Sequence, residues 1–86
     1  MQFINHTLVL TVRNKPGVLV RIAHVFARRG CNIRSLHVEP HEDEEWSTMT
    51  IVVTNVPKVD QVMRQLQKLV DVSNVVKQEK VTLSKD

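Results

Sequence analysis

A chain of 86 residues, of which 42% are hydrophobic and 24% charged, matches one small globular domain and excludes a disordered or fibrous chain. The net charge of +3 is too small to indicate a nucleic-acid partner by itself. A single cysteine, Cys31, excludes an internal disulfide and a thiolate-rich metal site. We expect a cytoplasmic protein, because the sequence shows neither the pattern of a signal peptide nor an apolar run long enough to span a membrane.

The first half of the chain predicts a strand, a helix and a second strand. Residues 7–12, TLVLTV, form a β-branched run that ends at the turn sequence RNKPG. From Gly17 onward, apolar residues recur every three or four positions, which predicts an amphipathic helix. Asn14 can cap the start of this helix, and Gly30 suits its end. Residues 33–38 then predict a second strand, which the sequence EPHEDEE ends.

The second half predicts a strand, a helix and a strand. Residues 46–53, WSTMTIVV, alternate as a third strand and form a hairpin with the second. Residues 59–70 follow helical spacing, with apolar side chains at Val59, Val62, Met63, Leu66, Leu69 and Val70. Residues 72–83 predict a fourth strand. The order βαββαβ predicts an α+β domain of the ferredoxin-like kind, with one antiparallel sheet and both helices on one face.

Ferredoxin-like domains carry many functions, so individual residues must discriminate among them. An RNA-recognition module stacks bases on strand aromatics, but WSTMTIVV has only one, at its start. A metal-carrying domain needs a CxxC pair, which the chain lacks, and Pro40 interrupts the spacing of His37, Glu39 and His41. The sequence GVLVR at residues 17–21 faintly resembles the phosphate loop of acylphosphatases, yet the second and third predicted strands have no interior asparagine to position a water molecule. These features argue against nucleic-acid binding, metal binding and catalysis.

The loop NKPG, which leads into the first helix, is the best candidate for a binding site. Free N–H groups at a helix N-terminus attract a carboxylate, and Gly17 lets a ligand approach the backbone. Asn14 and Asn32, one at each end of the helical unit, offer donors and acceptors that suit a zwitterionic amino acid. A purely structural interpretation stays open: Asn14 as a helix cap, Gly17 as a turn residue and Asn32 as a polar residue that begins a strand.

At these residues the sequence resembles a known family. The stretch LVLTVRNKPGVLVRIAHVFARRGCNIRSLHVEP, followed by WSTMTIVV and VMRQLQKLVDVSNVV, is similar to the ACT domain of the small, regulatory subunit of acetohydroxyacid synthase, also called acetolactate synthase. The most specific parts are the N-x-x-G-V/A-L loop, the F-x-x-R-G-x-N-I junction, the S-x-M-T-I strand and the QLxKLVDV helix end. The resemblance covers residues 6–80 of a single domain, 1–86.

The resemblance implies a regulator without an active site, which binds a branched-chain amino acid, typically valine, and mediates feedback inhibition and activation of a catalytic large subunit. Thiamine diphosphate, Mg and FAD are then expected only in that partner. In this family the effector lies between two ACT domains, so we expect a homodimer, with no metal in this chain and no nucleic-acid or membrane partner. The effector-binding residues that carry over are Asn14, Gly17, Val18, Leu19, Asn32 and Ile33.

The sequence departs from the family pattern at two positions that concern the contact to the catalytic subunit. Arg34 follows Asn-Ile where an acidic residue is common, and Thr48 fills the variable position of S-x-M-T-I. Many relatives also carry a second, C-terminal domain, so the chain is a naturally short form or a truncated one. The alternative function is a free-standing ACT-type amino-acid sensor that regulates a different partner. The sequence does not rank valine against leucine or isoleucine, because one methylene changes affinity by only about 1 to 3 kcal/mol.

Overall fold

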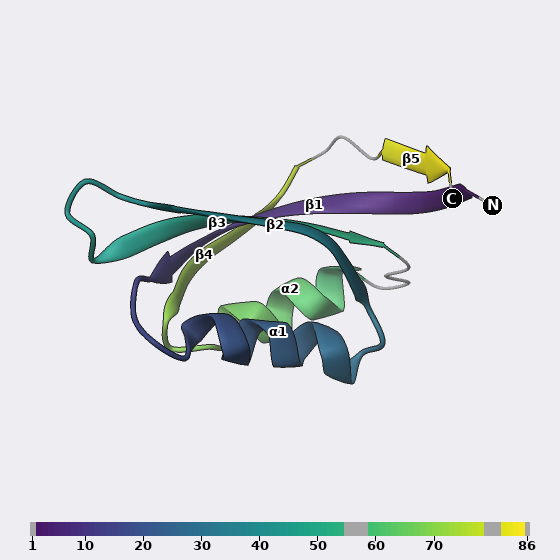
Figure 1. Ribbon diagram of the computed structural model, residues 1–86. Coiled ribbons are helices and arrows are strands. Elements are labelled where there is room, and N and C mark those ends of the chain that lie inside the picture. The colour runs from purple at the N-terminus through teal and green to yellow at the C-terminus, as the bar shows by residue number, and fades with distance from the viewer. Residues whose placement is uncertain (1, 55–58, 79–81, 86) are drawn as a thin grey trace.

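The computed structural model describes residues 2–54, 59–78 and 82–85 (Figure 1). In these residues the chain forms β1 (Gln2–Arg13), α1 (Val18–Arg28), β2 (Asn32–Pro40), β3 (Trp46–Thr54), α2 (Val59–Gln67), β4 (Val72–Lys77) and β5 (Thr82–Lys85). The strands make one antiparallel sheet in the order β2-β3-β1-β4, and β5 pairs with β1. Both helices lie on one face of this sheet (Figure 1). The predicted ferredoxin-like βαββαβ arrangement is confirmed.

The prediction that residues 72–83 form one strand is wrong. β4 ends at Lys77, and the next N–H, of Gln78, donates to the Thr7 carbonyl at 2.9 Å. The predicted range also includes residues 79–81, which lie outside the described part of the chain. β4 and β5 pair with successive parts of β1, at residues 8–12 and 2–5 respectively. β1 therefore begins five residues before the predicted strand, because pairing with β3 and β5 extends it over residues 2–6, in which apolar and polar residues do not alternate.

The predicted second helix is also too long at its C-terminal end. α2 ends at Gln67, and the chain continues in turns in which the Leu69 N–H donates to the Leu66 carbonyl and the Val72 N–H to the Leu69 carbonyl. Val70, counted in the apolar stripe, is 87% exposed. Neither helix is long and apolar enough to cross a membrane, within the residues described.

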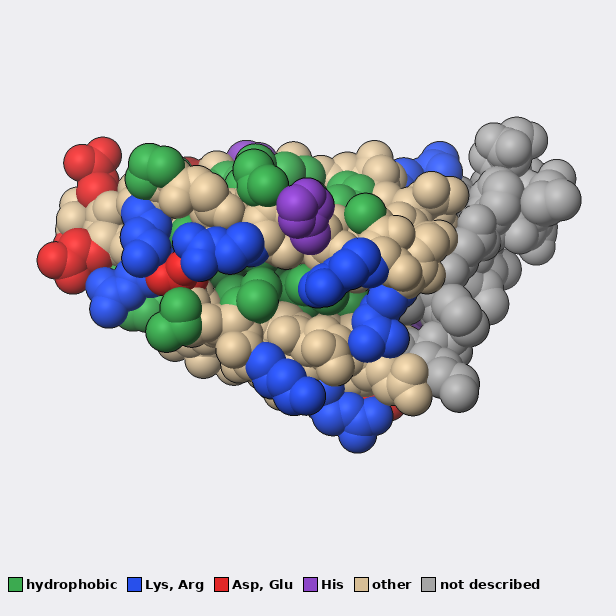
Figure 2. All heavy atoms as spheres, turned by 90° about the horizontal axis from the view of Figure 1, so that it is seen from below, with side chains coloured by type: hydrophobic (Ala, Val, Ile, Leu, Met, Phe, Trp, Pro, Cys, Tyr) green, Lys and Arg blue, Asp and Glu red, His purple; other side chains and the backbone are tan. Residues whose placement is uncertain are grey.

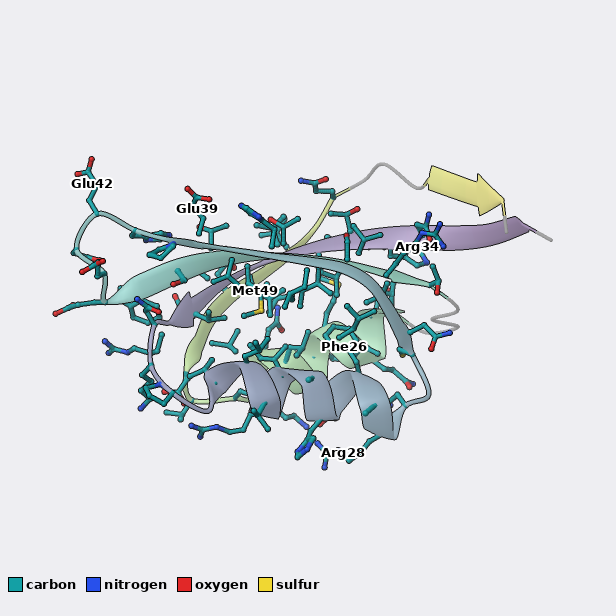
Figure 3. The ribbon with its side chains drawn as sticks, in the orientation of Figure 1. Phe26, Arg28, Arg34, Glu39, Glu42 and Met49 are labelled. Atoms are coloured by element: carbon teal, nitrogen blue, oxygen red, sulfur yellow. The ribbon has the colours of Figure 1, made fainter. Side chains whose placement is uncertain are left out.

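An aliphatic core fills the space between the sheet and the two helices. Every second residue of β3 is buried, as the alternating sequence predicts for a strand with one covered face. Phe26 of α1 and Met49 of β3 point into this space and are almost completely buried (Figure 3). Each such side chain contributes about 1.5 to 3 kcal/mol through burial. The other buried apolar residues of these layers include Leu8, Leu10, Val12, Val18, Ile22, Val25, Ile51, Val53, Val62 and Leu66.

Candidate functional site

Asn14 connects two loops at one end of the sheet. Its backbone N–H donates to the Glu45 carbonyl, and its side-chain Nδ2 donates to the Glu44 carbonyl, each at 2.9 Å. It does not cap α1, because Gly17 holds the N-cap position and no side chain bonds there. The interpretation of Asn14 as a helix cap is therefore wrong. Since the Glu44 carbonyl takes one of the two N–H donors of Nδ2, the amide oxygen Oδ1 and the second N–H remain for a ligand.

Gly17 precedes α1 with φ of 86°, in the left-handed region that glycine adopts without strain. A Cβ built at this position would meet nothing nearer than the Arg21 guanidinium, at 3.9 Å. Backbone conformation, and not crowding, therefore accounts for glycine here. The absence of a side chain leaves the first turn of α1 open, where backbone N–H groups lack partners within the helix. This turn contains no acidic residue, so its positive end is not neutralised from within the helix.

A pocket of about 290 Å³ lies where the β1–α1 loop meets the sheet. Three of the predicted site residues, Asn14, Val18 and Leu19, line it. Its remaining lining residues are Val12, Arg13, Lys15, Val38, Ser47 and Met49. The pocket thus combines an apolar wall with polar and basic groups from the loop, which is the chemistry that a small amphipathic molecule requires.

Asn32 and Ile33 do not line this pocket. They begin β2 at the far end of α1, whose 11 residues correspond to about 16 Å of helix. Both are exposed, and Ile33 keeps 40% of its surface open. Within one chain, the structure therefore separates the two asparagines that the sequence analysis placed in one site.

An ion-pair cluster holds the loop in place. The Asp71 carboxylate, 8% exposed, lies 3.1 Å from Lys15 Nζ and 3.1 Å from Arg21 Nη2. Its carbonyl also accepts the Arg13 N–H at 2.8 Å. The Arg13 guanidinium stacks 4.3 Å from the centre of the Trp46 ring. Two side-chain cations, Lys15 and Arg21, share the one Asp71 carboxylate, and Lys15 and Arg13 line the pocket, so positive charge remains beside it. Basic side chains are also numerous on the helix face (Figure 2).

The metal and thiol candidates do not assemble into sites. His37 Nε2 lies 2.9 Å from Glu39 Oε2, whereas His41 Nε2 instead contacts Thr48 Oγ1 at 2.8 Å. In the part of the chain that the structure describes, no three His, Cys, Asp or Glu side chains are grouped to hold a metal. Burial raises the pKa of the Cys31 thiol, and the positive charge of Arg29 lowers it by less. A protonated, buried thiol is a poor nucleophile.

Sequence reasoning missed Val38 and Ser47, which line the pocket from β2 and β3. Ser47 shares the period-two alternation of Met49 and Ile51, so the pattern could have placed it on the covered face. Its exposed fraction is 1%, equal to that of core residues.

The βαββαβ order and the sheet order β2-β3-β1-β4 are those of an ACT domain. The family model described as the AHAS small subunit-like ACT domain matches residues 8–74. The chain therefore belongs to this family.

Individual relatives agree with this assignment. The chain is 47% identical over 75 residues to the acetolactate synthase small subunit of Mycolicibacterium smegmatis, a match that covers 86% of this chain and 44% of that protein. It is 51% identical over 71 residues to the probable acetolactate synthase small subunit of Archaeoglobus fulgidus, with 81% and 45% covered. The chain thus spans less than half the length of these relatives.

Solved structures give the same result for the fold. The acetolactate synthase small subunit of Thermotoga maritima superposes with a TM-score of 0.74 at 39% identity, over 85% of this chain and 46% of that one. The ACT domain from the GTP pyrophosphokinase of Chlorobium tepidum gives a TM-score of 0.70 at 20% identity, over 91% of this chain and all of that one. At that identity, the second match shows a common fold and nothing about function.

Proposed function

We propose that this chain is the effector-binding domain of an acetohydroxyacid synthase regulatory subunit. It binds a branched-chain amino acid, valine first, and transmits feedback inhibition and activation to a catalytic large subunit. The observation that carries this proposal is the pocket of about 290 Å³ with Asn14 at its polar end and Val18 and Leu19 in its wall. Family membership supports the partner, which supplies thiamine diphosphate, Mg and FAD, whereas this chain contributes no catalytic group.

The effector's polar end would lie at the start of α1. Its carboxylate faces the N–H groups that follow Val18, whose own N–H bonds to the Lys15 carbonyl, and the side chain of Lys15, which lines the pocket. Its ammonium group faces Asn14 Oδ1. Its branched side chain packs against Val18 and the apolar residues beside it. Each charged group then meets the opposite charge or dipole.

A homodimer would complete the site. β2 is an edge strand, and its side chains Ile33, Leu36 and Val38 are each 40% exposed on the face that the helices cover elsewhere. A second copy placed on this edge would bury them and could bring its own Asn32 and Ile33 toward the pocket. Closed twofold symmetry is the commonest form of assembly, and it would provide two equivalent pockets. In this arrangement Asn14 of one copy and Asn32 of the other would belong to the same site, although the two residues lie apart within one chain.

The test is a pair of substitutions at Gly17. Asp and Asn have nearly the same size and tolerate a positive φ better than other side chains, so both variants share the same backbone cost. Gly17 does not itself line the pocket but directly precedes Val18, which does, so only Gly17→Asp brings a negative charge next to the position proposed for the effector's carboxylate. We expect calorimetric titration to detect no valine binding by Gly17→Asp, and weakened but measurable binding by Gly17→Asn. With Gly17→Asp, the catalytic subunit should stay active in the presence of valine.

Two results would contradict the proposal. One is a parent protein that binds none of valine, leucine and isoleucine at millimolar concentration. The other is a folded Gly17→Asp variant that binds valine as the parent does. Melting temperatures of both variants separate loss of the site from loss of the fold.

A further inference from the structure

Ser47 is a buried hydroxyl that the fold does not use. It is 1% exposed on the helix-facing side of β3, where the following inward residues, Met49 and Ile51, are apolar. Among the residues that the structure describes, none is a hydrogen-bond partner for its Oγ. An unpaired hydroxyl in a core destabilises the folded state, because water bonded to it in the unfolded chain. An alanine would fill this position without that cost, so packing of the core does not explain why a hydroxyl is present here.

Strand register places Ser47 at the polar end of the pocket. Ser47 pairs with Val12 on β1, and the next pair toward the loop is Trp46 with Arg13. One step further, the Asn14 N–H bonds to the Glu45 carbonyl. Met49 lies two residues deeper along β3. Ser47 is therefore the pocket-lining residue of β3 that is nearest to Asn14 in the sheet.

The groups around this end of the pocket are mostly hydrogen-bond donors. The N–H groups at the start of α1 and the side chains of Arg13 and Lys15, which line the pocket, favour a carboxylate. An ammonium group instead needs acceptors, and two neutral acceptors belong to pocket-lining side chains. One is Asn14 Oδ1, whose partner nitrogen is already bonded to Glu44, and the other is Ser47 Oγ. A serine hydroxyl accepts as readily as it donates.

We propose that Ser47 Oγ binds the α-ammonium group of the effector, together with Asn14 Oδ1, and so makes the pocket selective for amino acids over the corresponding carboxylic acids. This inference rests on the function proposed above. In the free structure Oγ itself is covered, so binding includes a rotation of the hydroxyl about χ1 toward the pocket that Ser47 lines. Serine has three staggered positions available for such a rotation. The hydroxyl then gains the partner that it lacks in the free protein.

The test compares two ligands on three forms of the domain. The ligands are valine and 3-methylbutanoate, which is valine without its amino group. In the parent, valine should bind more tightly than 3-methylbutanoate. In Ser47→Ala and in Ser47→Cys, which keeps the volume but accepts hydrogen bonds poorly, valine affinity should fall about tenfold or more. The affinity for 3-methylbutanoate should stay within about threefold of the parent, since this ligand has no group for Ser47 to bind.

Stability provides an independent readout. The melting temperature of ligand-free Ser47→Ala should equal or exceed that of the parent, because an unpaired buried hydroxyl has been removed. Ser73→Ala, at an exposed serine of β4, is the matched control and should change neither ligand's affinity.

Unchanged valine affinity in Ser47→Ala would overturn the role of Ser47 and leave the Gly17 site intact. Equal losses for both ligands would assign Ser47 a structural role and overturn the inference. A parent that binds no valine would overturn both proposals.

Discussion

The two edges of the sheet are built from similar residues but are covered differently. At the β4 edge, Val72 and Val75 are 8% and 5% exposed, because α2 packs beside them. At the β2 edge, Ile33, Leu36 and Val38 are each 40% exposed, although they lie in register with fully buried residues of β3. Two helices are thus too few to cover all four strands of the main sheet. Apolar residues at the uncovered edge are expected when another surface completes the layer, and the proposed second copy would provide that surface.

The pocket lies on the side of this uncovered edge. Val38 of β2 and Leu19 of α1, which is 44% exposed, form part of its wall. The opposite side of the β1–α1 loop is attached to the covered edge through Asp71, at the turn that precedes β4. One side of the site is therefore fixed within the chain, whereas the other depends on the proposed partner copy. Three pairs of substitutions test this contrast.

The largest expected effect is on assembly. Val38→Lys places a charge in the proposed interface of each copy, where symmetry brings like charges together in an apolar setting. We expect the dimer to dissociate at least about 100-fold more readily, as measured by sedimentation over a range of concentrations. Val76→Lys is the control, because Val76 is a 48% exposed valine on the other edge strand. A Val38→Lys protein that stays dimeric at micromolar concentration would rule out the β2 edge as the interface.

A smaller effect is expected on the free energy of unfolding when equivalent substitutions are made at the two edges of the sheet in one chain. Val75→Ala removes two carbons from a nearly buried site and should lower the free energy of unfolding by about 2 kcal/mol. Val38→Ala removes the same atoms from a half-open site and should cost less than about 1 kcal/mol when the protein is monomeric. Urea unfolding at low protein concentration measures both values. Equal losses would mean that the two edges are packed alike in the monomer.

Much of this fold could be predicted, because its strongest signals are local. The period-two pattern of β3 and the helical spacing of both helices each reflect a single covered face. The end of β4 was missed, since no glycine or proline follows Lys77 and β-branched residues return at Val81 and Thr82 after the polar sequence KQEK. In the candidate site, Asn14 and Val18 follow from a loop–helix signal. Ser47 does not, because only strand pairing brings it beside residues that lie more than thirty positions away.

The exposure of the β2 edge could not be predicted from the sequence either. The alternation correctly places Leu36 and Val38 on one face of the strand, because both pair with buried positions of β3. A pattern of this kind specifies which face is apolar but not which element covers it. The position of α1 over the sheet, which leaves this face open, is set by packing of the whole domain.

The smallest expected effect concerns the attachment of the loop to the covered edge. Asp71→Asn removes the carboxylate that pairs with Lys15 and Arg21, while leaving the backbone bond to Arg13 in place. The side chains of Lys15 and Arg21 are 54% and 51% exposed, so solvent screens both pairs and the loss should be about 1 kcal/mol. Added salt should reduce the difference from the parent, because it weakens exposed ion pairs.

Asp60→Asn is the matched control for this variant. Asp60 is 80% exposed, lies 3.9 Å from Lys77 and belongs to the first turn of α2, so its removal should lower the free energy of unfolding by less than about 0.5 kcal/mol. Valine binding by Asp71→Asn should be kept or strengthened, because Lys15, which lines the pocket, is then no longer neutralised by the Asp71 carboxylate. A loss of several kcal/mol would instead show that Asp71 supports the core of the domain. Weaker valine binding at unchanged stability would show that the ion pairs of Asp71 position the β1–α1 loop. The geometry of the loop would then matter more for valine binding than the charge of Lys15.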